Sequence, residues 1–255
     1  MTRFRRGLLV ILILSSLSST LLSTGCVRRV SPAPEGVKND ASLEELLNLY
    51  YFRRDMIDGF KGLVKVSSNS PRRGSQSFLA NWASQGEETR IQGFDFLGRT
   101  LFDLRLAGPS VSLSIPSERR VFEGGRDAFE EMAEKEIPLG SIGLIDWVGQ
   151  AGIPALSDAL LPALEKGDDF FILYLFKPGV GKGILDQKIW IERTKFWVKR
   201  VEGFDPTGAR RSVLTLDDYR KVGTFYFPFD IRGESRGEEV ALHFQEVNIT
   251  PGGRF

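Results

Sequence analysis

Apolar residues recur at every second position along most of this chain, and that period restricts the fold to a β-sheet. The first series of such stretches has members that begin at Phe60, Phe78, Phe102 and Val111. Short turns separate the stretches, so neighbouring strands are expected to pair antiparallel. A second series spans residues 170–176, 188–192, 196–203, 212–219, 224–231 and 240–248. Together the two series predict about eleven strands.

Helical segments are expected before and between the two series. Ser42 and Glu45 have the spacing of a capping box, and one apolar face follows them, made of Leu43, Leu46, Leu47, Tyr50 and Tyr51. Residues 125–167 have a helical pattern again, which ends in a segment with Leu156, Leu160, Leu161 and Leu164. A long antiparallel sheet tends to curl, and helices can cover its open face. We therefore expect a mainly β fold of the α+β class, in which a curled sheet and a helical lid enclose an apolar cavity.

The N-terminal residues have the pattern of an export signal. Three arginines precede an apolar run from Leu8 to Leu14, which is too short to span a membrane. Gly25-Cys26 follows and resembles the lipobox of bacterial lipoproteins, although Ser23 stands where that pattern prefers Leu. The resemblance implies cleavage before Cys26 and acylation of its thiol, for example by palmitate. The alternative is an ordinary signal peptide with an incidental cysteine, but cysteines of exported domains tend to occur in pairs and this one is single.

This interpretation divides the chain into a signal peptide (1–25), a lipid-anchored tether (26–41) and one domain (42–255). Loss of residues 1–25 leaves 31 basic and 33 acidic side chains, a formal charge of −2. Such a balance gives no support for nucleic-acid binding. Val27 follows the cysteine where lipoproteins retained in the inner membrane carry Asp. By that sorting rule, the expected location is the outer membrane, facing the periplasm.

No constellation of residues in the sequence indicates an enzyme. His243 is the single histidine, and its alternating neighbours place it on a strand face. The stretch Lys177–Gly183 lacks the spacing of a phosphate-binding loop and is expected to be a hairpin connection. The acidic pairs at 130–131, 168–169 and 217–218 fit solvated surface better than a glycosidase site. We expect no catalytic residue, no metal and no cofactor.

Aromatic residues are the stronger signal, with 19 Phe, 5 Tyr and 4 Trp in the chain. Trp82, Trp190 and Trp197 fall in predicted strands and Trp147 in the helical insertion, where each suits either a cavity wall or an ordinary core. The turn Gly93–Arg99 is unusual because three of the five residues between its bounds are apolar: Phe94, Phe96 and Leu97. Either this tip is an exposed contact site, or Phe94 and Phe96 fold back into the core.

The order of these motifs resembles the LolB family of outer-membrane lipoprotein receptors. The similarity rests on Phe60–Val66, Phe78–Trp82, Thr89–Gly98, Asp127–Met132 and Ile137–Val148, and it covers most of residues 43–155. Later strands look more like the wider LolA/LolB superfamily, and residues 156–167 are expected to be an insertion relative to the family. The family fold is an unclosed antiparallel half-barrel with helices over an apolar cavity, in agreement with the layout above.

The resemblance also implies a function and a set of site residues. In the family a leucine on a protruding hairpin is needed to insert cargo into the membrane, and Leu97 is its counterpart, with Phe96 and Phe94 beside it. The expected cavity residues are Phe78, Trp82, Phe102, Leu104, Trp147 and Trp190. A monomer is expected to accept the acyl chains of lipoproteins, from a LolA-like periplasmic carrier, and to transfer them to outer-membrane lipid. The alternatives are a related protein that binds another lipid or senses envelope stress, and a structural lipoprotein without a ligand.

Overall fold

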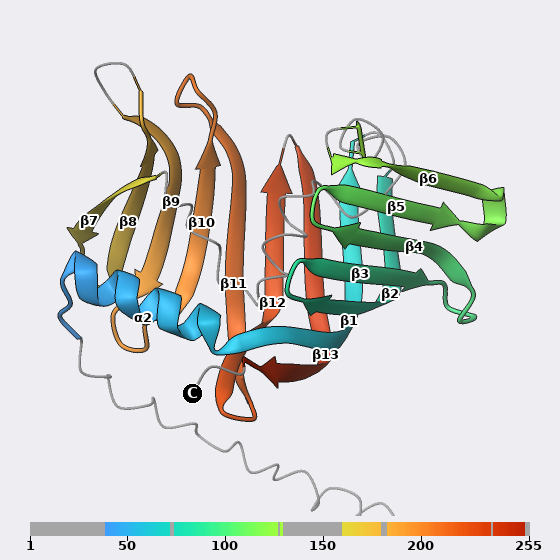
Figure 1. The fold of residues 1–255 in the computed structure, drawn as a ribbon, viewed down its shortest axis with the longest axis horizontal. Coiled ribbons are helices and arrows are strands. Elements are labelled where there is room, and N and C mark those ends of the chain that lie inside the picture. The colour runs from blue at the N-terminus through green and yellow to red at the C-terminus, as the bar shows by residue number, and fades with distance from the viewer. Residues whose placement is uncertain are drawn as a thin grey trace, which may run out of the picture. The chain divides into compact units, whose positions relative to one another are not determined.

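The computed structural model describes residues 39–71, 74–126, 128–129, 160–179, 183–235 and 237–252. Within these residues, helix α2 (Leu43–Asp55) precedes one antiparallel sheet of thirteen strands (Figure 1). The first six strands are β1 (Ile57–Ser70), β2 (Gly74–Gln85), β3 (Glu88–Phe94), β4 (Thr100–Ala107), β5 (Ser110–Ile115) and β6 (Arg120–Gly125). The other seven are β7 (Leu161–Lys166), β8 (Phe170–Lys177), β9 (Ile184–Glu192), β10 (Val198–Phe204), β11 (Arg210–Val222), β12 (Phe225–Ser235) and β13 (Glu238–Pro251).

The sheet combines two antiparallel meanders, β1 to β6 and β7 to β13, and they join where the first strand, β1, pairs with the last, β13. β1 pairs with β2 on one side and with β13 on the other, so the sheet runs from β6 through β1 and β13 to β7. β6 and β7 are its two edges, and the sheet is unclosed. A short 3₁₀ turn, η1 (Pro116–Glu118), joins β5 to β6. The predicted fold class is therefore confirmed.

Alternating side chains form the core on one face of this sheet. In one register row, Val66 lies opposite Leu242, which lies opposite Ile231 and then Leu216. A second row runs from Leu173 through Ile189 and Val201 to Leu214. All eight side chains are buried. A period of two on a half-buried sheet produces such rows, since each strand turns every second side chain to the same face.

Helix α2 begins where the capping box was predicted. The Ser42 hydroxyl accepts a hydrogen bond from the Glu45 backbone N–H at 3.2 Å, and the Ser42 N–H donates to Glu45 Oε2 at 2.8 Å. Leu46 and Tyr50 are buried in the core of the sheet. The helix lies across β8 to β11 near the turn that joins β9 to β10 (Figure 1). Its apolar face therefore covers one end of the sheet, as the sequence predicted.

The prediction of a helical insertion over 125–167 is wrong at the C-terminal end of that range. Residues 161–166 form β7, which pairs with β8, and Leu164 packs against the core. Leu161 and Leu164 fit a helical spacing, but β8 offers an unpaired edge and the backbone hydrogen bonds of the pairing decide the outcome. Pro162 is tolerated because β7 is an edge strand. With β6 also distinct, the strands number thirteen instead of about eleven, and residues 130–159 lie outside the described part of the chain.

Candidate functional site

Four of the predicted cavity residues meet on the apolar face of the sheet, over β2 to β4. Trp82 lies opposite Ile91, which lies opposite Leu104, and the rings of Phe78 and Phe102 meet edge to face with 5.5 Å between centroids. Phe78, Trp82, Phe102 and Leu104 are all buried. The Phe102 ring lies over Gly93, where an added Cβ would be 2.4 Å from Phe102 Cε1. The four residues therefore lie together in the core of the sheet, and their role as cavity residues stays a prediction.

Trp82 has an unsatisfied polar group within this apolar surface. Its side chain is only 1% exposed, and among the described residues its Nε1–H has no hydrogen-bond partner. The nearest ring contact is with Phe244, which also packs against Phe60 and Phe227. A buried donor without an acceptor costs about 1–3 kcal/mol. An acceptor carried by a bound molecule, such as an ester or amide carbonyl, would remove this cost.

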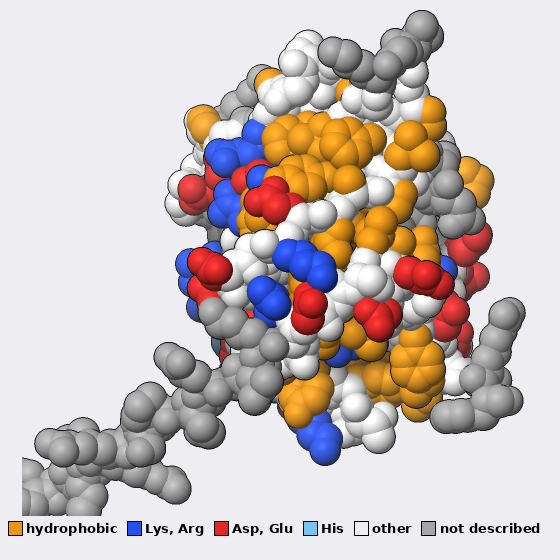
Figure 2. All heavy atoms as spheres, turned by 90° about the vertical axis from the view of Figure 1, so that its left-hand side faces the viewer, with side chains coloured by type: hydrophobic (Ala, Val, Ile, Leu, Met, Phe, Trp, Pro, Cys, Tyr) orange, Lys and Arg blue, Asp and Glu red, His pale blue; other side chains and the backbone are white. Residues whose placement is uncertain are grey.

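Trp190 does not belong to that group, so its assignment to the cavity is wrong. Its strand neighbours Ile189 and Ile191 point into the core, and Trp190 points to the opposite face, where it lies opposite Arg200. Lys188 Nζ sits 4.7 Å from its ring centroid. On β9 the alternation itself identifies this outer face, since Trp190 shares it with Lys188 and Glu192. Figure 2 looks onto the β7 and β8 side of the molecule and shows apolar side chains at the surface, bordered by basic ones.

Two further predicted site residues, Trp147 and Cys26, lie outside the described residues.

The turn between β3 and β4 presents its apolar residues to solvent. Phe96 is 92% and Leu97 63% exposed, whereas Phe94 is half-buried at the end of β3. The Asp95 carboxylate fixes the turn by accepting hydrogen bonds from the backbone N–H groups of Leu97 and Arg99, both at 2.9 Å. Gly98 provides the left-handed residue that the turn needs, with a φ of +78°. Of the two alternatives for this tip, the exposed one holds for Phe96 and Leu97.

The turn between β10 and β11 has the same construction with a polar tip. Asp205 accepts from the N–H groups of Thr207 and Ala209 at 2.8 and 3.1 Å, and Gly208 has a φ of +85°. In both turns the glycine N–H donates to the backbone carbonyl of the aspartate, at 3.0 Å from Gly98 to Asp95 and at 2.9 Å from Gly208 to Asp205. Pro206 and Thr207 stand where the first turn has Phe96 and Leu97. The geometry of the turn therefore does not require apolar residues at its tip.

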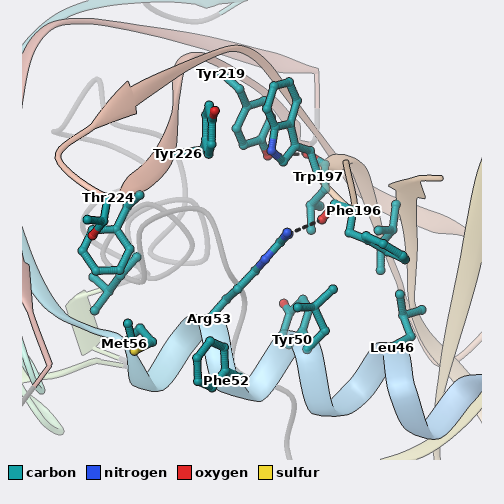
Figure 3. A pocket seen from close by; sticks show the side chains of 15 residues that line it. Leu46, Tyr50, Phe52, Arg53, Met56, Phe196, Trp197, Tyr219, Thr224 and Tyr226 are labelled. Atoms are coloured by element: carbon teal, nitrogen blue, oxygen red, sulfur yellow. Dashed lines mark hydrogen bonds between the residues drawn. The ribbon is translucent and has the colours of Figure 1, made fainter. Parts of the chain in front are cut away.

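A pocket of about 280 Å³ lies between α2 and the two turns that join β9 to β10 and β11 to β12 (Figure 3). Seven of its fifteen lining residues are aromatic: Tyr50, Phe52, Phe196, Trp197, Tyr219, Phe225 and Tyr226. Trp197 stacks on Tyr219 with 4.6 Å between ring centroids. The side chain of Arg53 crosses the pocket, where NH1 donates to the Phe196 carbonyl at 2.6 Å and NH2 to the Lys195 carbonyl at 3.1 Å.

The electrostatics of this pocket follow from its burial. Burial lowers the pKa of Arg53, because the charged form loses hydration, and burial raises the pKa of Tyr219, which stays neutral. The Tyr219 hydroxyl donates to the Val198 carbonyl at 2.5 Å. Sequence reasoning missed Arg53 as a site residue. The signal was its spacing from Leu46 and Tyr50, since positions i, i+4 and i+7 share one helix face and this face was otherwise apolar.

Other polar groups form surface pairs. His243 lies on β13 with Nδ1 2.6 Å from Asp230 Oδ1, in agreement with its predicted place on a strand face. Across the described ranges, no group of three or more His, Cys, Asp or Glu side chains is arranged to hold a metal ion. None of the helices in this part of the chain is long and apolar enough to cross a membrane.

Comparison with known proteins identifies the fold. No protein-family model and no curated protein sequence matches the chain. Among solved structures, a LolA superfamily protein from Nitrosomonas europaea is 13% identical, with a TM-score of 0.54 over 80% of this chain and 93% of that one. A putative outer membrane lipoprotein-sorting protein domain from Vibrio parahaemolyticus is 13% identical, with a TM-score of 0.58 over 82% and 93%.

A third solved structure has the same arrangement. A DUF1329 family protein from Desulfovibrio piger is 13% identical, with a TM-score of 0.59 over 82% of this chain and 94% of that one. At this identity the likeness concerns the fold, and the LolB family in particular is not identified by it. The unclosed antiparallel sheet with α2 across it is the fold of LolA superfamily and lipoprotein-sorting domain proteins.

Proposed function

We propose that this chain is a lipid-binding lipoprotein of the bacterial envelope, which accepts acylated cargo on the apolar face of its sheet and delivers it to the outer membrane. The observation that carries the proposal is the contrast between the two aspartate turns. Because Pro206 and Thr207 occupy the same geometry, folding does not explain why Phe96 and Leu97 are apolar. An exposed apolar tip on a rigid turn is suited to contact a membrane.

The tip would act by transient burial in lipid. Full burial of a Leu or Phe side chain is worth about 1.5–3 kcal/mol. Two such side chains give a weak, reversible contact, which suits repeated docking better than permanent insertion. The hydrogen bonds of Asp95 hold the backbone of the tip in place, so little ordering entropy is lost when it enters the bilayer.

The apolar face over β2 to β4 would hold the acyl chains. Each buried methylene contributes about 0.8 kcal/mol, so a chain binds firmly and still moves to any surface of equal apolarity. The Trp82 N–H, which is buried and has no acceptor in the described part of the protein, would donate to a carbonyl of the acylated cargo. No covalent step is required. Acylation of Cys26 and the tether that follows it would keep the domain beside the receiving bilayer, and a LolA-like carrier is the proposed donor.

The test exchanges the tips of the two turns in a full chain that carries Cys26→Ser and so lacks the acyl anchor. We expect Phe96→Pro with Leu97→Thr to abolish sedimentation with phospholipid vesicles and to leave the unfolding midpoint unchanged. The matched control adds Pro206→Phe and Thr207→Leu to that variant, which keeps the composition and moves the apolar tip to the other turn. This control should fold equally well.

Delivery is tested with the same pairs of substitutions in the lipid-anchored protein as the single copy in the cell. Lipoproteins should fail to reach the outer membrane when the tip is removed and also when it is moved, because delivery needs the tip beside the apolar face. Normal localisation with the tip removed would contradict the insertion role. Normal localisation after depletion of the whole protein would contradict the transfer function and leave the lipid-binding alternatives.

A further inference from the structure

We propose that the pocket between α2 and the turns that join β9 to β10 and β11 to β12 binds an anionic single-chain amphiphile, with the guanidinium of Arg53 as the ligand of its head group. The ligand class is a carboxylate or a phosphate monoester on an apolar chain. This goes beyond the transfer of lipoprotein acyl groups, which are held through uncharged ester and amide bonds. It also concerns a different set of residues from the Trp82 face.

Arg53 has unused capacity to bind an anion. A guanidinium has five N–H donors, and the hydrogen bonds to the carbonyls of Lys195 and Phe196 use two of them. Within the described ranges no carboxylate forms an ion pair with Arg53, and it is the one charged residue among those that line the pocket. A partly buried cation that contacts only neutral acceptors favours the binding of an anion beside it, because a charged partner compensates for the hydration that the cation has lost.

The surrounding charges also favour an anion. Lys195 Nζ lies 4.3 Å from the Trp197 ring centroid at the same end of the sheet. Lys199 lies 5.4 Å from the Tyr219 ring centroid and forms an ion pair with Asp217 at 2.8 Å. Two further cations therefore stand over the aromatic wall. Asp217 neutralises Lys199, and the carboxylate of Glu192 also acts on Tyr219, so the attraction for an anionic head comes from Arg53 and Lys195.

The rest of the pocket suits an apolar chain. Leu46, Met56 and Ile57 line it on the helix side, and Phe225 and Tyr226 line it on the side of the turn between β11 and β12. Figure 3 shows the Arg53 side chain reaching from α2 between these two sides toward Phe196. Tyr226 is 53% exposed and Phe52 62%, so apolar surface continues outward from the pocket. One cation within an aromatic and aliphatic wall is the chemistry that recognises an amphiphile with one anionic end.

Arg53 also joins α2 to the turn between β9 and β10, and a purely structural role for it makes a different prediction. Helix docking requires only donors to two carbonyls and gives no preference among head groups. The discriminating measurement is therefore the affinity of one protein for ligands that share a chain. The probes are dodecanoate, dodecyl phosphate and dodecanol, measured by calorimetry on the full chain with Cys26→Ser. Acetate and inorganic phosphate test the head groups alone.

We expect dodecanoate or dodecyl phosphate to bind about tenfold or more tightly than dodecanol, as a charge-assisted hydrogen bond allows. The stronger of the two anions identifies the head group. Arg53→Gln should remove this preference and leave the weak binding of dodecanol, and Arg53→Lys should restore part of it. The control is Arg54→Gln, since Arg54 lies next in the chain, 3.6 Å from Asp55, and does not line the pocket.

Equal affinity of the unsubstituted protein for dodecanoate and dodecanol would overturn the proposal, whatever the stability of the variants. A preference that survives Arg53→Gln would overturn it as well. Binding of acetate or phosphate alone with the same affinity as the amphiphiles would limit the site to small anions and contradict the amphiphile. None of these outcomes depends on cargo delivery, so this proposal and the transfer function can fail separately.

Discussion

Asp95 binds Arg99 with both carboxylate oxygens. Oδ1 accepts from the Arg99 backbone N–H at 2.9 Å, and Oδ2 accepts from its side-chain Nε at 2.7 Å. The same Oδ1 accepts from the N–H of Leu97, so one side chain closes the turn and orients the apolar tip. A substitution of Asp95 therefore separates the position of the tip from its composition.

We expect Asp95→Ala to weaken vesicle binding while Phe96 and Leu97 remain in the chain. The tip would lose the acceptor that fixes its backbone, and ordering it in the bilayer would then cost conformational entropy. The measurement is vesicle sedimentation. Asp205→Ala is the matched control, because it removes the corresponding acceptors from the polar turn and should leave vesicle binding unchanged. Equal effects of the two substitutions would mean that the orientation of the tip is unimportant.

The ion pair between Arg90 and Asp103 gives a pH-dependent contribution to stability. Arg90 donates to both oxygens of Asp103, at 3.0 and 2.6 Å, and this bonding lowers the pKa of the carboxyl. A carboxyl with a lowered folded-state pKa stabilises the fold above its unfolded value of about 3.9 and loses this effect as the pH falls through the folded value.

Arg90→Gln should therefore lower the free energy of unfolding at pH 7 by up to about 1 kcal/mol, since the pair is partly exposed. The difference from the unsubstituted protein should shrink as the pH falls below about 3.9 and through the lowered folded-state pKa of Asp103. Urea unfolding at pH 7 and at a series of acidic pH values checks this. A difference that stays constant across the series would show that Arg90 acts through packing instead of charge.

The sequence predicted the sheet more reliably than it predicted which face each strand turns inward. Strands such as β4, with Asp103 and Arg105 between apolar residues, could be oriented from the pattern alone because only one face is apolar. In β8 the residues 170–176 are apolar throughout, so both faces suited a core and the pairing with β7 and β9 decided between them. Trp190 lies on β9 and shares its face with Asp186, Lys188 and Glu192, so alternation points it outward, and its assignment to the cavity followed its aromatic side chain instead.

The buried residues of the sheet face and the apolar residues of the turn could be located from sequence, whereas the pocket under α2 could not. Phe78, Trp82, Phe102 and Leu104 follow from alternation, and Phe96 and Leu97 are conspicuous as apolar residues in a turn. The pocket combines Arg53 with Trp197 and Tyr219, which lie far away in the chain. Its existence depends on how α2 meets two turns of the sheet, and a local pattern does not specify that contact.

Gly93 should be intolerant of any side chain, because the Phe102 ring occupies the space. We expect Gly93→Ala to lower the free energy of unfolding by about 1–3 kcal/mol through overpacking. Phe102→Leu alone should cost about 1 kcal/mol as a change of shape in the core. In the double variant the two costs should be less than additive, since the smaller side chain leaves room for the added methyl group. A double-mutant cycle with zero coupling would contradict the contact.

Truncation should destabilise the protein much more at Trp82 than at Trp190, although both were predicted to line a cavity. Trp82→Ala removes a fully buried indole and should lower the free energy of unfolding by about 3–5 kcal/mol. Trp190→Ala removes a partly buried ring with Lys188 above it and should cost about 1 kcal/mol. Urea unfolding distinguishes the two.

Trp82→Phe adds a test of the unpaired N–H, because it deletes the donor and keeps an aromatic ring. If that donor binds the carbonyl of an acylated ligand, Trp82→Phe should weaken the binding of an acylated peptide about fivefold to tenfold. The affinity for a plain alkane chain, which has no acceptor, should stay the same, and equal losses for both ligands would show that Trp82 contributes only apolar surface.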